Sequence, residues 1–358
     1  MKIAHLDFEN YLRGGQKQIM YLLEGLRAGG VSCVLFGRAG SPLFNWALER
    51  GFPAYGYRFL SVYDPFFINR LRKDLFREKP DAVHFHSGHA HTAGYLAIPE
   101  GSPIKKLLTR RVPFILKNDP FTKKKYSALD MSVAISAYIK TMLERRMPVN
   151  KIAFIRSAVS FPERPVRKAI PEGVEQEQFK IAVASALKIG RDKDFRTLFS
   201  AMKILHDPRI TMMVFGCGPD EKKIKKMAED LGVSKDIVFA GFKDDMFPYL
   251  KGADIFVHSV FNEALGTSII EAMFCGLPVI ASAAGGIPEV VHNGENGFLF
   301  EPGNASMLAD MIIHLKNDEV LRKEISERNR KAGEDFSSER MVRSYLELYR
   351  NLTEGNGA

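Results

Sequence analysis

The chain has 358 residues, of which 46% are hydrophobic and 26% are charged. This composition is typical of a soluble globular protein with about two domains, and it excludes a disordered, collagen-like or coiled-coil chain. No run of about 18 apolar residues occurs, so we expect no membrane-spanning helix. The first residues lack the apolar core of a signal peptide, and the three cysteines lie too far apart for a disulfide framework or a zinc site. We therefore expect a cytoplasmic protein.

The net charge of +9 is unevenly distributed along the chain. Residues 1–165 contain 26 Lys and Arg against 13 Asp and Glu, whereas residues 166–358 contain 25 against 29. Such asymmetry favours an anionic partner for the first half, namely a nucleic acid, an anionic membrane surface or an anionic substrate. The alternative is that these basic residues are solvated surface residues.

Short apolar runs alternate with helical patterns in the first half of the chain. Apolar runs predict strands, and apolar residues at helical spacing predict helices. The expected strands are 2–8, 31–36, 82–86, 114–117 and 132–135, and the expected helices are 16–28 and 42–50.

A stretch rich in proline and charge, residues 161–178, interrupts this alternation, and we interpret it as an interdomain linker. Beyond it, the expected strands are 181–185, 211–215, 237–239, 255–258 and 278–281, and the expected helices are 195–205, 221–231, 246–250 and 267–274. Residues 305–351 are almost entirely helical in pattern.

Alternation in both halves predicts an α/β protein with two doubly wound parallel sheets. We expect one domain over residues 1–165 and a second over 166–337, with a C-terminal helix at about 338–353 that packs back on the first domain. Ligands of doubly wound sheets bind at the carboxyl ends of the strands, and with two facing domains we expect the site in the cleft between them.

The segment 261–275 is the strongest candidate for ligand binding. A strand is expected to end just before it and a helix to begin near residue 266, so the amides of residues 266–268 have no partners in the helix. These amides and the helix dipole favour an anion such as a pyrophosphate. Glu263 precedes the helix and Glu271 lies within it, and both carboxylates are suited to accept hydrogen bonds from sugar hydroxyls. The alternative is a helix-capping carboxylate followed by a solvated glutamate.

Seven residues separate Glu263 from Glu271, and this spacing resembles the E-x7-E motif of the retaining family-4 glycosyltransferases. The similarity continues through 275–291 and 293–300, and upstream through 215–219, 239–242 and 253–257. Several motifs in one order are more specific than the two glutamates alone. The resemblance covers nearly all of 180–302 and, more loosely, the first 160 residues. It implies the GT-B architecture, in which two doubly wound Rossmann-like domains face each other across a cleft.

The resemblance also implies roles for individual residues. Glu271 would bind the nucleotide ribose, Glu263 would contact the donor sugar, and Lys193 would neutralise the departing diphosphate. The other donor-binding residues that it implies are Gly14, Gly15, Gly216, Gly218, Gly241, Phe242, Leu265, Gly266, Thr267 and Ser268.

One position departs from the family pattern. Many members have an arginine near the end of the first strand of the second domain, where this chain has Ala186. Lys188 and Arg191 are the candidate replacements for that missing cation.

Four histidines within eight residues, His84, His86, His89 and His91, raise the question of a metal site. No cysteine or carboxylate lies among them and a glycine interrupts the cluster, so we expect no metal. The resemblance implies instead that His86, at the end of its strand, contacts the donor sugar. We expect His84 in the sheet, and His89 and His91 at a helix start or on the acceptor side.

The stretch 105–125 carries eight basic residues and one acidic residue, Asp119. We expect a loop that faces an anionic acceptor or membrane, since each basic group near an anionic membrane contributes about 1 kcal/mol. The candidate residues are Arg110, Arg111, Lys117, Lys123, Lys124 and Lys125. The alternative is a solvated basic loop.

The sequence thus predicts a metal-independent retaining glycosyltransferase of the hexosyltransferase type that needs no cofactor. It would move a sugar from a UDP-, GDP- or ADP-linked donor to an acceptor hydroxyl. The expected acceptor is a lipid-linked or lipopolysaccharide-type glycan of a bacterial cell surface. We expect a peripheral protein on the inner face of the cytoplasmic membrane.

Two other functions remain open at this point. One is a nucleotide-sugar epimerase or hydrolase on the same architecture. The other is a nucleic-acid-binding protein, which the pI of about 9.3 suggests. We expect no nucleic-acid partner, because the basic stretch contains only Phe114 and Phe121 as stacking phenylalanines.

Overall fold

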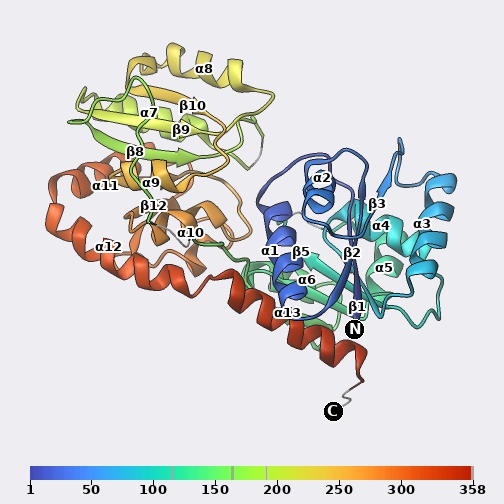
Figure 1. Ribbon diagram of the computed structural model, residues 1–358. Helices are drawn as coiled ribbons and strands as arrows, with labels where there is room; N and C mark the ends of the chain where they lie inside the picture. Colours follow the sequence, from blue (N-terminus) through green and yellow to red (C-terminus); the bar gives the residue numbers. More distant parts are fainter. Residues whose placement is uncertain (114–115, 163–164, 191, 356–358) are drawn as a thin grey trace. The chain divides into compact units, whose positions relative to one another are not determined.

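The computed structural model describes residues 1–113, 116–162, 165–190 and 192–355. The chain forms two compact units (Figure 1). Unit 1 comprises Met1–Ser160 and Ser338–Ala358, and unit 2 comprises Phe161–Ser337. The first boundary lies a few residues before the expected one at 165, and unit 1 includes the last helix of the chain.

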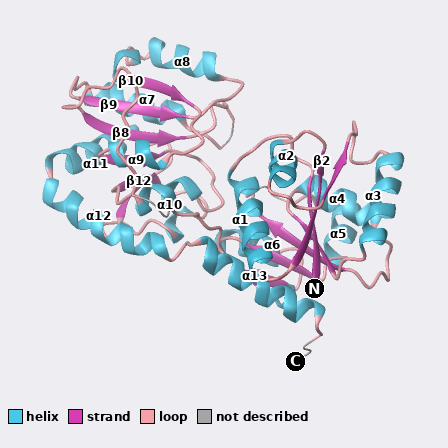
Figure 2. Cartoon of the chain, viewed as in Figure 1, coloured by secondary structure: helices cyan, strands magenta, loops and turns pink. Residues whose placement is uncertain are grey.

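Strands and helices alternate in unit 1 (Figure 2). The strands are β1 (Lys2–Asp7), β2 (Ser32–Arg38), β3 (Ala54–Tyr57), β4 (Ala82–Phe85), β5 (Lys105–Arg110), β6 (Met131–Ala134) and β7 (Ile152–Phe154). The helices are α1 (Gly14–Ala28), α2 (Pro42–Glu49), α3 (Pro65–Glu78), α4 (Gly88–Ala97), α5 (Pro120–Ser127), α6 (Ala137–Glu144), the short 3-10 helix η1 (Val149–Lys151) and α13 (Ser338–Thr353).

The sheet of unit 1 is parallel, with the strand order β3-β2-β1-β4-β5-β6-β7. Strands such as β1 and β2 are buried along most of their length, as expected for a parallel sheet covered on both faces. The order reverses between β1 and β4. In doubly wound sheets, ligands bind at such a switch point, outside the carboxyl ends of the strands.

Two expectations for unit 1 are wrong. Residues 105–110 were expected in a basic loop, but they form β5, between β4 and β6. Its apolar part is only the buried pair Leu107 and Leu108. Because charged residues flank this short run, its sequence does not show the apolar pattern of a strand. The expected strand 114–117 is absent at 116–117, and residues 114–115 lie outside the described residues.

Unit 2 repeats the alternation of strands and helices. Its strands are β8 (Phe179–Ala184), β9 (Ile210–Phe215), β10 (Ile237–Gly241), β11 (Ile255–His258), β12 (Val279–Ser282) and β13 (Gly297–Phe300). Its helices are α7 (Phe195–Leu205), α8 (Glu221–Asp230), α9 (Phe247–Gly252), α10 (Thr267–Phe274), α11 (Ala305–Asn317) and α12 (Glu319–Glu334), with the short 3-10 helices η2 (Ser234–Asp236) and η3 (Ile287–Glu289).

The sheet of unit 2 is also parallel, in the order β10-β9-β8-β11-β12-β13. Its core is built from apolar residues of the strands together with the inward faces of α7, α8, α11 and α12. The order reverses between β8 and β11, which gives unit 2 a switch point of its own. The predicted architecture of two doubly wound α/β sheets is therefore confirmed.

The proline-rich segment 161–178 contains no helix or strand at its described positions. It is nevertheless fixed to unit 2 by several contacts. The Phe161 ring stacks on Phe274 with centroids 3.8 Å apart, and the Ala169 amide donates to the Pro248 carbonyl at 2.9 Å. The segment is a packed strap rather than a free linker.

The long C-terminal helical pattern is divided into three helices. Asp318 ends α11 and caps α12, where its carboxylate accepts a hydrogen bond from the Leu321 amide at 2.8 Å. The last helix, α13, packs on α1 of unit 1. Gly25 makes this close approach possible, because a Cβ at that position would lie 2.4 Å from a Val342 methyl group.

None of the described helices combines the length and the hydropathy that a transmembrane span requires.

We predict that Gly25→Ala destabilises unit 1 by about 1–3 kcal/mol, because the new methyl group overpacks the contact between α1 and α13. In an unobstructed helix the same change would instead stabilise by about 1 kcal/mol. Urea unfolding followed through Trp46, the only tryptophan, measures the difference. Combining Gly25→Ala with Val342→Ala should restore most of the lost stability. A neutral or stabilising effect of Gly25→Ala would contradict this packing.

Candidate functional site

Loops that follow β8, β11 and β12 meet near the switch point of unit 2. Lys193 and Val260 form an isolated antiparallel bridge, and the Phe261 amide donates to the Asp192 carbonyl at 2.9 Å. The Ser282 hydroxyl accepts from the Val260 amide and donates to the Val260 carbonyl. These main-chain contacts hold the lysine-bearing loop and the loop before α10 together.

Glu263 occupies the centre of this arrangement. Lys193 Nζ lies 3.1 Å and His258 Nε2 lies 3.5 Å from Glu263 Oε2. Burial would raise the pKa of Glu263, but the His258 ring and the Lys193 ammonium outweigh burial and lower that pKa to about 2. Glu263 is therefore an ionised hydrogen-bond acceptor at neutral pH and has no proton to donate as a general acid.

Glycine at position 285 is required by the main chain of Glu263. A Cβ on Gly285 would lie 2.0 Å from the Glu263 carbonyl oxygen, and its φ of +57° disfavours any other residue. The same carbonyl accepts a hydrogen bond from the Gly286 amide at 3.0 Å. The glycine pair after β12 thus fixes the position of the carboxylate.

His258 is a site residue that the sequence pattern indicated only as the end of a strand. Burial lowers its pKa, and the Glu263 carboxylate offsets this only in part, so the imidazole is neutral at pH 7. Apart from its approach to Glu263, Nε2 has no hydrogen-bond partner in the described part of the chain.

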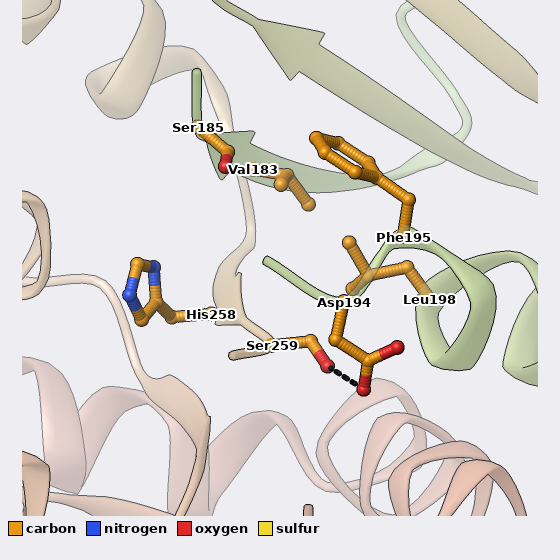
Figure 3. A pocket seen from close by; sticks show the side chains of 7 residues that line it. All are labelled: Val183, Ser185, Asp194, Phe195, Leu198, His258 and Ser259. Atoms are coloured by element: carbon orange, nitrogen blue, oxygen red, sulfur yellow. Dashed lines mark hydrogen bonds between the residues drawn. The ribbon is translucent and has the colours of Figure 1, made fainter. Parts of the chain in front are cut away.

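His258 also lines a narrow recess between β8, β11 and α7, which has no room for a water molecule (Figure 3). The other lining residues are Val183, Ser185, Asp194, Phe195, Leu198 and Ser259. The Ser259 hydroxyl donates to Asp194 at 3.1 Å, and Asp194 also caps α7 by accepting from the Thr197 amide. Asp194 is therefore engaged in holding α7 against the end of β11, directly beside Lys193.

The N-terminus of α10 is arranged as the sequence predicts. Gly266, at φ +88°, is the N-cap residue; no side chain caps the helix, and its first turn has no acidic residue. Thr267 and Ser268 are partly buried in that first turn, whereas Leu265 is only 1% exposed and offers its main chain alone. Glu271 follows on the helix and is partly buried.

Gly216 and Gly218 have a packing role that is independent of any ligand. A Cβ on Gly216 would lie 2.0 Å from the Ser185 carbonyl oxygen, and one on Gly218 would lie 2.2 Å from the Leu187 carbonyl oxygen. These glycines let the loop after β9 lie directly on the loop after β8.

Gly241 ends β10 with a φ of +70°, and its carbonyl accepts from the Gly216 amide at 2.9 Å. The next residue, Phe242, is 51% exposed, so its ring is available for stacking. Of the two candidate cations near Ala186, Lys188 is exposed and Arg191 lies outside the described residues.

Unit 1 holds a buried histidine cluster at its own switch point. His5 of β1 is in register with His84 of β4, and His86 follows two residues later on the same face. Nitrogen atoms of the three rings lie within 4.8 Å of one another. His5 was missed from the sequence because only the pairing of β1 with β4 brings it to the cluster.

The hydrogen bonds around His86 determine which of its nitrogens carries the proton. Arg111 Nη1 lies 3.2 Å from His86 Nδ1, and an arginine only donates, so Nδ1 is the acceptor. The proton of the neutral ring is then on Nε2, which donates to His5 Nδ1 at 3.0 Å. Burial, with smaller contributions from His84 and Arg111, holds the pKa of His86 well below its usual value.

His84 is hydrogen-bonded to residues from two other elements. Its Nδ1 lies 2.6 Å from the Tyr349 hydroxyl of α13, and its Nε2 lies 2.6 Å from Thr109 Oγ1 of β5. Thr109 in turn bonds the Tyr345 hydroxyl at 2.8 Å. The C-terminal helix therefore contributes two buried tyrosines to the support of the cluster.

This cluster is poorly suited to hold a metal ion. Both nitrogens of His84 and both of His86 are already engaged, and the Arg111 guanidinium lies against the same rings. His89 and His91 lie in α4 and make other contacts, His89 with Glu9 and His91 with the Lys125 carbonyl. The four neighbouring histidines therefore do not form one site.

The six basic residues expected on the acceptor or membrane side fall into two groups. Arg110 is buried and donates to the Tyr126 hydroxyl at 3.1 Å, Arg111 lies against His86, and Lys125 donates to Thr92 Oγ1 at 3.0 Å. These three are engaged within unit 1. Lys117, Lys123 and Lys124 are exposed.

The N-terminus of α1 lies beside the histidine cluster. Gln16 accepts from the Arg13 amide and donates to Asp7 Oδ2, both at 3.2 Å. Burial raises the pKa of Asp7 to about 6. Gly14 and Gly15 begin the helix, and a Cβ on Gly15 would make only an ordinary 3.7 Å contact with Arg111. Packing alone therefore does not require glycine at position 15.

Two family models match this chain. The model described as glycosyl transferases group 1 matches residues 167–332, and the model described as glycosyltransferase family 4 matches residues 12–160. Together they span most of both units.

Similar curated proteins include N-acetyl-alpha-D-glucosaminyl L-malate synthase of Bacillus anthracis. It is 28% identical over 302 residues, which cover 80% of this chain and 79% of that protein. The lipopolysaccharide core biosynthesis glycosyltransferase LpsE of Rhizobium meliloti is 35% identical over 158 residues, which cover 44% of this chain and 46% of LpsE.

Solved structures with the same fold include a glycosyltransferase from Rickettsia africae, with a TM-score of 0.82, 22% identity and 99% coverage of both chains. Anabaena HepE in complex with UDP-glucose also has a TM-score of 0.82, at 20% identity, over 98% of this chain and 100% of HepE. At these identities the likeness establishes the fold.

We predict that the stability of unit 1 falls as the pH is lowered from about 7.5 to about 5.5. The unfolded chain binds protons on His5, His84 and His86 below about pH 6.5, whereas burial prevents this in the native state, at a cost of up to about 1.4 kcal/mol per pH unit for each histidine. Asp7, whose pKa is raised to about 6, and His89, whose pKa the Glu9 carboxylate raises, act in the opposite direction, but the buried His91, whose pKa is lowered to about 3, adds a fourth histidine to the three.

Urea unfolding followed by Trp46 fluorescence at the two pH values measures this change. Replacing His5 by Asn should remove part of the pH dependence. Stability that stays constant or rises on acidification would contradict the buried neutral state of the cluster.

Proposed function

Since the chain belongs to the group 1 and family 4 glycosyltransferases, we propose that it transfers a sugar from a nucleotide-sugar to an acceptor hydroxyl with retention of anomeric configuration and without a metal ion. The observation that carries this proposal is the ionised Glu263, paired with Lys193 and followed directly by the uncapped N-terminus of α10. This arrangement offers an acceptor for sugar hydroxyls next to donors for a diphosphate.

In this proposal, unit 2 binds the nucleotide. The main chain at Gly266, Thr267 and Ser268 holds the diphosphate, because helix N-termini attract anions. Glu271, further along the same helix, accepts hydrogen bonds from the ribose, and the exposed Phe242 ring stacks on the base. UDP and UDP-glucose bound to Anabaena HepE, which has the same fold, support a nucleotide-sugar donor.

Lys193 stabilises the charge that develops on the leaving diphosphate. In the structure its partner is Glu263, so donor binding would share the ammonium between a carboxylate and a phosphate oxygen. The low pKa of Glu263 also makes it a weak base and a weak nucleophile. We therefore assign Glu263 to the sugar hydroxyls, and the proton of the acceptor to the departing diphosphate.

For unit 1, we propose that His86 contacts the donor sugar and that Gly14 and Gly15 approach the diphosphate. Because both nitrogens of His86 are bonded, a sugar hydroxyl would compete with Arg111 for Nδ1. Arg111 is then a positioning residue that holds the ring when no sugar is present.

We propose a lipid-linked or lipopolysaccharide-type glycan as the acceptor, presented on the inner face of the cytoplasmic membrane. The basic charge of residues 1–165 and the similarity to LpsE support this choice. The similarity to an N-acetyl-alpha-D-glucosaminyl L-malate synthase makes a small soluble hydroxy acid the second candidate. The family assignment favours transfer over the epimerase or hydrolase and over nucleic-acid binding.

A thermal-shift panel with UDP-, GDP- and ADP-sugars identifies the base, since a ligand at 100 times its Kd stabilises the folded state by about 2.7 kcal/mol. Product analysis with and without acceptor then separates transfer from hydrolysis and epimerisation. Stabilisation by none of these nucleotides would contradict the proposal.

We predict that Glu271→Ala weakens nucleotide binding by about 10- to 150-fold, because a hydrogen bond to a charged acceptor contributes about 1.5–3 kcal/mol. Calorimetry measures the affinity, and circular dichroism checks the fold. Glu295→Ala, an exposed glutamate of the same unit, is the matched control and should change nothing. An unchanged nucleotide affinity of Glu271→Ala would contradict the assignment of Glu271 to the ribose.

We also predict that transfer activity survives an excess of EDTA. The diphosphate would already be neutralised by Lys193 and by main-chain amides, and both nitrogens of His84 and of His86 in the histidine cluster are engaged. Zinc bound stoichiometrically to the purified protein, together with loss of activity on chelation, would contradict metal independence.

A further inference from the structure

A group of large apolar side chains is exposed in the loop between β3 and α3 and in the first turn of α3 of unit 1. Leu60 is fully exposed, at 104% of its reference surface, Phe66 is 86% exposed and Tyr63 is 62% exposed. All three lie within seven consecutive residues of the chain. We call this set the apolar loop. Soluble proteins seldom expose several large apolar side chains so close together unless something covers them.

The apolar loop is held in place by its own contacts. Phe59 stacks on Phe67 with centroids 4.2 Å apart and meets Phe8 edge-on at 5.6 Å. Asp64 caps α3 by accepting from the Phe66 amide at 2.9 Å, and its own amide donates to the Ser61 carbonyl at 3.1 Å. Some aromatic rings therefore anchor the loop in the core while others point outward.

Basic residues surround the apolar loop. Arg58 precedes it, and Arg70 and Lys73 on α3 follow it, all of them exposed. The two nearest acidic residues of this segment are engaged. Asp64 caps the helix, and Asp74 is buried and accepts from the Tyr57 hydroxyl and from Arg77.

A second basic element adjoins the loop through an aromatic contact. The Tyr63 ring lies 6.3 Å from the Phe121 ring at the start of α5, and Phe121 also meets Tyr95 of α4 at 5.6 Å. Lys123 and Lys124 are exposed on α5. The apolar loop therefore lies beside the remaining exposed part of the basic stretch 105–125.

We propose that the apolar loop and its basic border are a membrane-docking surface, in which Leu60, Tyr63 and Phe66 enter the interface of an anionic bilayer while the lysines and arginines contact its headgroups. Aromatic and leucine side chains with a basic border are the chemistry that such an interface recognises. This inference rests on the membrane-presented acceptor of the proposed function and specifies the part of unit 1 that meets the lipid.

Co-sedimentation tests the surface with vesicles of phosphatidylcholine alone or mixed with phosphatidylglycerol. At about 0.1 M salt we expect stronger binding to the mixed vesicles than to phosphatidylcholine alone. Leu60→Ser with Phe66→Ser should reduce that binding at least about tenfold at both about 0.1 M and 1 M salt, because apolar insertion is not screened. Lys123→Gln with Lys124→Gln should reduce binding several-fold at low salt alone.

Matched controls are Leu48→Ser on α2 and Val320→Ser on α12, which remove exposed apolar side chains elsewhere and should leave vesicle binding unchanged. A fluorescence readout is independent of sedimentation. With Trp46→Phe as background, Phe66→Trp should show a blue shift on mixed vesicles, and Val320→Trp should not.

Parent-like binding of the Leu60 and Phe66 double variant, or no blue shift at position 66, would overturn the inference. Nucleotide binding, measured in the same preparations, keeps this result separate from the proposed function. If the parent protein binds the nucleotide but no vesicle, the docking surface is refuted while the donor assignment stands. If the parent protein binds vesicles but no nucleotide-sugar, the donor assignment is refuted while the docking surface stands.

Discussion

The reversal of strand order within each parallel sheet is the constraint on which the site depends. Where neighbouring strands send their crossovers in opposite directions, the loops at their carboxyl ends diverge and leave space for side chains. In unit 2 the reversal lies between β8 and β11, and Lys193, His258 and Glu263 lie at that end of those strands. In unit 1 it lies between β1 and β4, where His5, Asp7 and His86 lie.

The carboxylates at the two switch points have pKa values shifted in opposite directions. At the one in unit 2, an ammonium and a neutral imidazole keep a carboxylate ionised despite burial, so the loop before α10 carries a fixed charge. At the one in unit 1, burial keeps three histidines neutral and raises the pKa of Asp7 to about 6. Charge is thus available where a diphosphate is proposed to leave, whereas unit 1 presents neutral imidazoles beside Asp7 and the Arg111 guanidinium, supported by tyrosines of α13.

Much of unit 2 was predictable because its signals are local. The bounds of α7, β11 and α10 are those expected. In each of these elements the apolar residues follow one regular pattern, and a cap or turn residue marks its end. Glu263 and Glu271 belong to one continuous segment, so their places before and within α10 also follow from the sequence. The sequence did not identify His258 as a site residue, because its approach to Glu263 depends on how the loop between β11 and α10 folds back.

Unit 1 was less predictable because its site is assembled by non-local pairing. His5 joins His86 only through the register of β1 with β4, and Tyr345 and Tyr349 arrive from the other end of the chain. The charges around Leu107 and Leu108 suggested a solvated loop, although the pairs with β4 and β6 make this segment an interior strand. Local pattern analysis contains no information on such pairings.

Hydrogen–deuterium exchange with and without the nucleotide-sugar that gives the largest thermal shift tests the central claim most directly. If the chemistry takes place at the switch points, the nucleotide should slow exchange in the segment 259–271 and in the loops that follow β8 and β9. The segment 305–334, which covers α11 and α12, should be unaffected. Protection confined to α11 and α12, with none in 259–271, would contradict the account.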